Sequence, residues 1–242
     1  MLPHLISRRV LEKENRLIVL QGLAHTAPRG FYEKIQRDIN EAVDNGDLLL
    51  VEGLRNDPAV PLNSSKAKRL RWYFRDFQFK KLPAVSTKKD STVTEKQVIR
   101  LPAGTISTDM SLEEFVNACA TQNVPYSWPL HIVVWAISTV ISPDGTIGDR
   151  FPTWLRMIIA FVGAKRFNSW HKRSVDAMEE KLNPIMIEYR NQRIFEQAIA
   201  LDGGKNLFLL YGEKHIPGLM LLFEQAGWVL KQSTELDLNT FS

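Results

Sequence analysis

Three short apolar runs that each end in glycine constrain the fold of this chain most strongly. They are residues 16–22 (RLIVLQG), 48–53 (LLLVEG) and 206–212 (NLFLLYG). A continuous apolar run of this length is typical of a strand buried on both faces, as in a parallel sheet. Residues 31–46 lie between the first two runs, carry their apolar side chains on one helical face and end in Asn45 and Gly46, a left-handed stop. We therefore expect a strand, helix, strand unit whose two strands are parallel.

The later part of the chain repeats this alternation. Residues 183–204 predict a helix, with Asn183 as N-cap, Pro184 as the first helical residue and two glycines beyond its end. The third apolar run follows it, then a helix at 216–227 and a strand at 228–232. Weaker strand patterns occur at 96–101 and 104–109, and a capping box at Ser111 predicts a helix over 111–120. Together these patterns predict an α/β fold, with a mostly parallel central sheet flanked by helices.

Two apolar stretches in the middle of the chain, residues 129–142 and 154–164, require a separate explanation. Each is shorter than the roughly 18 to 20 apolar residues of a transmembrane helix. We expect a buried helical hairpin or a cap over a pocket, and peripheral contact of this apolar hairpin with a membrane surface is the alternative. The chain is thus predicted to be a single domain, 1–242, with a helical insertion at about 121–170.

The thiol content and the N-terminal segment bear on the compartment. The single cysteine, Cys119, excludes an internal disulfide and a zinc cluster built from cysteines. Its apolar neighbours favour a place in the core over a role as nucleophile. The first residues contain no uninterrupted apolar segment before their charges, so they do not resemble a secretory signal. We expect a cytoplasmic protein, with association to a membrane as the alternative.

A basic and aromatic segment at 65–81 (SKAKRLRWYFRDFQFKK) permits two interpretations. Alternating cations and aromatic rings can bind nucleic acid or an anionic membrane surface. The same residues can form a helix whose basic face is solvated while Leu70, Phe74 and Phe77 turn inward at helical spacing. We favour the helix, because the net charge of +4 is too small to argue for a polyanionic partner, and we do not expect nucleic acid to bind.

Three polar residues that follow the predicted strands form the candidate site. His25 and His215 each close a Gly-x-x-His motif, and Glu52 directly follows the second apolar run. Ligands of open α/β sheets bind beyond the carboxyl ends of the strands, so these side chains should meet at one edge. We expect the glycine before each histidine to let the backbone turn sharply as its strand ends.

Two imidazoles and one carboxylate are a common ligand set for an open metal site, which keeps a position for water. A bound divalent metal lowers the pKa of water from 15.7 towards about 7 and polarises a carbonyl oxygen. The constellation of His25, Glu52 and His215 therefore predicts hydrolysis of an acyl or peptide bond. For either histidine motif alone, a hydrogen bond from the imidazole to the backbone is the simpler alternative.

A buried arginine is expected beside this site. The helix after Pro184 carries an apolar stripe, and Arg190 and Asn191 lie on that same stripe. An arginine aimed inward requires an anion, which can be Glu52 or the oxyanion that develops during attack on a carbonyl.

These segments, taken in order, resemble the TraB family, which includes the pheromone-shutdown proteins, the GumN-like proteins and the Tiki metalloproteases. The resemblance rests on Gly22 to His25, on LLLVEG with Glu52, on EYRNQ with Arg190, and on Gly212 to His215 followed by IPGL. It covers the two ends of the chain, and the middle matches loosely around TDMSLEEF.

The resemblance implies a metal-dependent hydrolase of the peptidase kind, with manganese or cobalt favoured over zinc as in Tiki. It implies that His25 and His215 are metal ligands, that Glu52 is a ligand or general base, and that Arg190 is a supporting charge. Asp109 is a further candidate, for which capping the next helix is the alternative, and Glu213 could compete as a ligand. The expected partner is a peptide or a small acyl substrate. The alternative function is a non-catalytic regulatory or peptide-binding protein.

Overall fold

The computed structural model describes residues 5–24, 26–53, 57–73, 92–124, 181–182, 184–201 and 203–241. The chain divides into two compact units. The first comprises Met1–Arg55, Lys89–Ser111 and Met186–Ser242, and the second comprises Asn56–Lys88 and Leu112–Ile185. The predicted insertion at about 121–170 lies almost wholly outside the described residues, so the prediction of a single domain stays a prediction.

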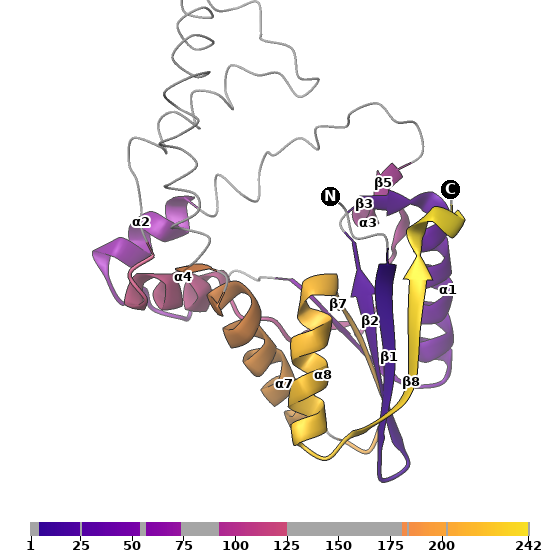
Figure 1. The fold of residues 1–242 in the computed structure, drawn as a ribbon. Coiled ribbons are helices and arrows are strands. Elements are labelled where there is room, and N and C mark those ends of the chain that lie inside the picture. The colour runs from indigo at the N-terminus through magenta and orange to yellow at the C-terminus, as the bar shows by residue number, and fades with distance from the viewer. Residues whose placement is uncertain are drawn as a thin grey trace, which may run out of the picture. The chain divides into compact units, whose positions relative to one another are not determined.

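In the described part of the chain, the first unit forms a six-stranded sheet of order β6-β4-β7-β2-β1-β8 (Figure 1). Its parallel strands are β2 (Arg16–Leu23), β4 (Leu48–Val51), β6 (Ile106–Ser107) and β7 (Leu207–Gly212). The strand β1 (Leu5–Lys13) is antiparallel to β2 and to β8 (Val229–Asp237). This mixed, mostly parallel sheet confirms the predicted α/β fold.

Helices cover both faces of this sheet. Helix α1 (Arg29–Asp44) lies on one face, and α7 (Arg190–Ala200) and α8 (Ile216–Gln225) lie on the other (Figure 1). Successive side chains of a strand point to opposite faces, so β7 supplies Phe208 and Leu210 to the α1 side and Leu209 and Tyr211 to the other. The predicted burial of β7 on both faces is confirmed.

The N-terminal strand β1 was not predicted from the sequence. It forms a hairpin with β2 through Glu14 and Asn15, whose φ angles are 52° and 63°. Two consecutive positive φ angles are the geometry of the tight hairpin turn that matches strand twist, and asparagine tolerates it well. Asn15 between two strand-forming runs was therefore the available sequence signal.

The prediction of a strand at 96–101 is wrong. Helix α3 (Glu95–Val98) occupies its first half, and the Ile99 N–H donates to the Glu95 carbonyl over 2.8 Å. Val98 and Ile99 pack against the core cluster beneath α1, and one helical turn is enough to deliver them. The preceding strand β5 (Thr92–Thr94) pairs with β3 (Thr26–Pro28) in a separate two-stranded sheet.

Within the second unit, α2 (Ser65–Tyr73) packs against α4 (Leu112–Thr121). Leu70 is buried while Lys68 and Arg69 are exposed, as expected for a helix with a solvated basic face. Phe74 and Phe77 lie outside the described residues. Cys119 is buried, and this burial raises the pKa of its thiol to about 12, so it is a core residue.

The helix predicted from Pro184 begins as a π-helical turn, η2 (Pro184–Tyr189), and continues as α7. Its predicted N-cap, Asn183, lies outside the described residues, as do both apolar stretches, 129–142 and 154–164. Of the helices that are described, none has the length and apolar character needed to cross a bilayer.

The central position of β7 predicts a large energetic difference between two leucines. Leu209 is fully buried, whereas Leu221 on α8 is 54% exposed. We expect Leu209→Ala to lower the free energy of unfolding by about 2–5 kcal/mol, because it leaves a cavity between β7 and the two helices. Leu221→Ala should change it by less than about 0.5 kcal/mol. Urea unfolding of both variants measures the difference, and equal losses would contradict the burial assigned to β7.

Candidate functional site

The candidate site lies at the carboxyl ends of β4, β6 and β7, which are neighbouring parallel strands. The Glu52 N–H donates to the Leu210 carbonyl over 3.1 Å, which extends the β4–β7 pairing by one residue. Asp109 follows β6, and its Oδ2 accepts a 3.3 Å bond from the Gly53 N–H. The backbone therefore holds both carboxylates at one edge of the sheet.

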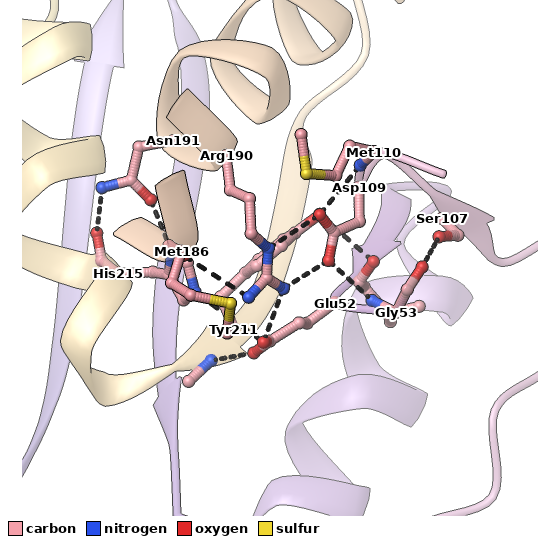
Figure 2. A network of polar contacts seen from close by, with 12 residues as sticks. Glu52, Gly53, Ser107, Asp109, Met110, Met186, Arg190, Asn191, Tyr211 and His215 are labelled. Atoms are coloured by element: carbon pink, nitrogen blue, oxygen red, sulfur yellow. Dashed lines mark hydrogen bonds and ion pairs between the residues drawn. The ribbon is translucent and has the colours of Figure 1, made fainter. Parts of the chain in front are cut away.

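Arg190, the first residue of α7, joins these two carboxylates (Figure 2). Its Nε donates to Asp109 Oδ1 over 3.0 Å and its Nη2 donates to Asp109 Oδ2, which makes a two-pronged contact. The same Nη2 donates to Glu52 Oε1 over 2.7 Å. The pairing of Arg190 with Glu52, one of the two expected anions, is present, and Asp109 is its second partner.

Charge governs the protonation of this group. Burial favours protonation of Glu52, but the charge of Arg190 and the hydrogen bonds from Arg190 and from the Gly212 N–H together hold the pKa of its carboxyl below the usual value. Burial opposes the charge of Arg190, and the bonds and charges of Asp109 and Glu52 outweigh it and raise the guanidinium pKa. Glu52 is thus an ionised carboxylate at neutral pH, held beside a permanent cation.

His215 lies beside this ion pair, on the 3-10 turn η3 (Glu213–His215) that follows β7. The Asn191 Nδ2 donates to the His215 carbonyl over 3.3 Å, which directs the Asn191 Oδ1 at the imidazole Nδ1, 2.6 Å away. An amide oxygen only accepts, so Nδ1 carries the proton. Burial and the charge of Arg190 lower the pKa of His215, against the opposing effect of the two carboxylates. The imidazole is therefore neutral, with its lone pair on Nε2.

The Nε2 atom that carries this lone pair lies 3.7 Å from Glu52 Oε1. Two acceptors at this separation can both bind one cation at about 2.0–2.2 Å. Asp109 is less able to join them, because each of its oxygens already accepts two bonds, one from Arg190 and one from a backbone N–H, whereas each Glu52 oxygen accepts one. Within the described residues no group of three histidine, cysteine or acidic side chains is arranged to hold a metal ion.

The other predicted ligands are placed as follows. His25 lies outside the described residues, although Leu23, two positions before it, pairs with Gly212 on β7. Glu213, which could have competed as a ligand, instead bonds through its carboxylate to Ser7 on β1. The predicted association of His25, Glu52 and His215 is therefore supported for the last two residues and stays a prediction for the first.

The glycines of the site provide space, which corrects the expectation that they permit sharp turns. Gly212 has φ −52° and ψ 140°, an extended conformation open to any residue. Its N–H donates to Glu52 Oε2 over 2.7 Å, and an added Cβ would lie 3.0 Å from that oxygen. At Gly218, in the IPGL segment, a Cβ would lie 2.2 Å from Asn191 Nδ2. Each glycine thus allows a polar side chain to reach the backbone.

Tyr211 and Thr108 are fully buried beside the site, and neither was predicted from the sequence to belong to it. The Tyr211 hydroxyl donates to the Val51 carbonyl over 3.1 Å and accepts from the Thr108 hydroxyl. The Tyr211 and His215 rings meet edge to face, with centroids 6.2 Å apart. The available signal was the polar Tyr211 at the end of an otherwise apolar strand.

A scan against protein-family models and searches of curated proteins and of solved structures found no match for this chain. The TraB resemblance therefore stays a prediction that rests on the motifs themselves.

The burial of Arg190 predicts a large loss of stability when its charge is removed. Arg190→Met would leave the buried Asp109 and the partly exposed Glu52 without their cation, and we expect the free energy of unfolding at neutral pH to fall by about 3–5 kcal/mol. Arg193→Met on the same helix, where the side chain is 41% exposed, should change it by less than about 0.5 kcal/mol. Equal effects in urea unfolding would show that Arg190 is not the ion that holds the site together.

The lowered pKa of Glu52 predicts a pH dependence. A carboxyl whose pKa is lower in the folded state stabilises the fold above its unfolded value, here 4.5, and loses that contribution as the pH falls through the folded value. The difference in unfolding free energy between the unaltered protein and Glu52→Gln should therefore shrink as the pH falls from 7 towards 3. Glu33→Gln, at an exposed surface ion pair, serves as the control. A difference that stays constant with pH would refute the assignment.

Proposed function

We propose that this chain is a metal-dependent hydrolase of the cytoplasm that acts on a peptide or a small acyl substrate. Glu52 and His215 are two of its metal ligands, and His25, from the other Gly-x-x-His motif, is the third. One observation carries the proposal: His215 Nε2 and Glu52 Oε1 lie 3.7 Å apart, while Asn191 Oδ1 accepts a hydrogen bond from the Nδ1 of the same imidazole. A metal-bound histidine typically donates its second ring N–H to such a partner.

The charge balance of the site supports a cation at this position. Two carboxylates, Glu52 and Asp109, share the single guanidinium of Arg190, and the neighbouring imidazole is neutral. Among the described residues, one negative charge of this network therefore has no cation beside it, and the Glu52 side chain is only 25% exposed. Such a charge is costly to bury unless a cation accompanies it.

A divalent cation there would supply Lewis-acid chemistry, because it lowers the pKa of water and polarises the carbonyl under attack. The protein's own residues would fix the geometry. Arg190 and the Gly212 N–H hold the two oxygens of Glu52, and Asn191 holds the imidazole of His215. Arg190 acts through Glu52 in this arrangement, so we propose it as a positioning residue for that carboxylate.

Metal analysis together with peptide and ester hydrolysis tests the proposal. Protein purified without chelator should contain manganese, cobalt or zinc, and it should cleave a peptide or an ester when one of these is supplied. His215→Ala should lose metal and activity together, because it removes the Nε2 ligand. Lys214→Ala, at the exposed neighbouring position, should keep both.

The outcomes separate the two functions that the sequence allows. Metal binding without cleavage of any peptide or ester would favour a non-catalytic regulatory or peptide-binding protein. Failure of the protein to bind any of the three metals would overturn the proposal of a metal-dependent hydrolase. Arg190→Lys should fold but lower turnover by about 10- to 100-fold, because an ammonium cannot reproduce the planar, forked contact with two carboxylates that positions Glu52.

A further inference from the structure

The Glu213 side chain makes a long-range contact that the proposed function does not use. From the turn after β7 its carboxylate reaches Ser7 on β1, where Oε2 accepts the Ser7 N–H over 2.8 Å and Oε1 accepts the Ser7 hydroxyl over 2.6 Å. Ser7 itself is 7% exposed. Strand β2 lies between β7 and β1 in the sheet, so the Glu213 side chain crosses an entire strand to make these bonds.

The crossing point is Gly22, the glycine of the first Gly-x-x-His motif. A Cβ at this position would lie 2.0 Å from Glu213 Oε2, and 3.0 Å from both the Ser7 carbonyl oxygen and Ile6 Cγ2. The nearest of these distances is far below van der Waals contact, so any larger residue would displace the carboxylate. Gly22 is not among the glycines with positive φ, which shows that space is the requirement here.

The contact also completes the backbone pairing of β1. The β1–β2 register ends with Arg8 opposite Gln21, and Ser7 is the next residue of β1 towards the N-terminus. Its N–H is bonded by the Glu213 carboxylate in place of a strand carbonyl. A buried N–H left without a partner would be costly, so this bond has a structural reason to persist.

Glu213 and His215 share the single 3-10 turn η3, and each end of this turn is held by a different side chain. The Glu213 carboxylate is anchored to Ser7 at the first residue, and Asn191 binds the imidazole and the carbonyl of His215 at the last. Lys214 between them is exposed. We propose that Glu213 is a positioning residue for His215, and that Gly22 is a glycine so that the Glu213 carboxylate can pass. This proposal rests on the proposed role of His215. The glycine of the first Gly-x-x-His motif then leaves room for the side chain that positions the histidine of the second motif.

NMR of the His215 imidazole tests the proposal without any metal. The ring nitrogens are assigned by their absence from His215→Ala, and in the unaltered protein they should show one tautomer with the proton on Nδ1. In Glu213→Ala the two nitrogen shifts should move towards each other, because an unanchored turn lets the tautomers average. Glu213→Gln, which keeps one acceptor oxygen, should restore much of the original pattern. Unchanged His215 shifts in folded Glu213→Ala would overturn the proposal.

Mn²⁺ affinity, followed by the EPR signal of free Mn²⁺, supplies the second readout. Glu213→Ala and Gly22→Ala should each weaken binding about 10- to 100-fold, the usual effect of removing a residue that orients a ligand. In the Glu213→Ala background, Gly22→Ala should weaken binding less than it does alone, since no carboxylate remains to be displaced and only the 3.0 Å approaches to Ser7 and Ile6 remain. Gly203→Ala is the control, because a Cβ there meets only the Leu201 carbonyl at 3.9 Å.

The outcomes keep the two proposals distinct. If the unaltered protein binds no Mn²⁺, the proposed function fails for this metal, and the NMR experiment still decides the role of Glu213. If Gly22→Ala does not fold but Gly22→Ala combined with Glu213→Ala does, the proposal that Gly22 leaves room for the passage of the Glu213 carboxylate is supported. If Gly22→Ala is equally harmful with and without Glu213, by affinity or by folding, that passage is refuted.

Discussion

The site depends on one buried guanidinium between two carboxylates. Arg190 joins α7 to residues that follow β4 and β6, because it bonds Glu52 and Asp109 at the same time. A charge that is 3% exposed must keep its partners, so helix and strand ends are held in one arrangement. Glu52 is then directed at His215, and its second oxygen is bound by the Gly212 N–H on β7. The candidate ligands are in this way preorganised by groups that are not ligands themselves.

Glycine has a common function across this edge of the sheet. Gly22 lies under the Glu213 carboxylate, Gly212 under that of Glu52, and Gly218 against the amide of Asn191. None of the three has a positive φ, so each serves to leave room for a polar side chain. A glycine in a short motif can therefore be required for the space it leaves rather than for its backbone conformation. Here the Glu213 side chain of the second motif lies against Gly22 of the first.

The elements that the sequence predicted are those encoded by local periodicity. The buried strands β2, β4 and β7, helix α1, and the proximity of Glu52 to Arg190 all follow from apolar runs and a helical stripe. The hairpin of β1 depends on a turn in which Glu14 has an uncommon positive φ. Helix α3 depends on packing against the core beneath α1, which the local sequence pattern does not indicate. The orientation of the His215 imidazole could not be predicted either, because it is set by Asn191, 24 residues away in the chain.

We propose that a histidine nitrogen and the Glu52 carboxylate bind one divalent cation. Electron spin echo modulation of Mn²⁺ added to the protein measures this most directly, because coordinated imidazole nitrogen modulates the echo. We expect nitrogen modulation in the unaltered protein that is diminished in His215→Ala and unchanged in Lys214→Ala. Bound Mn²⁺ without any nitrogen modulation, or with the same modulation in His215→Ala, would contradict it.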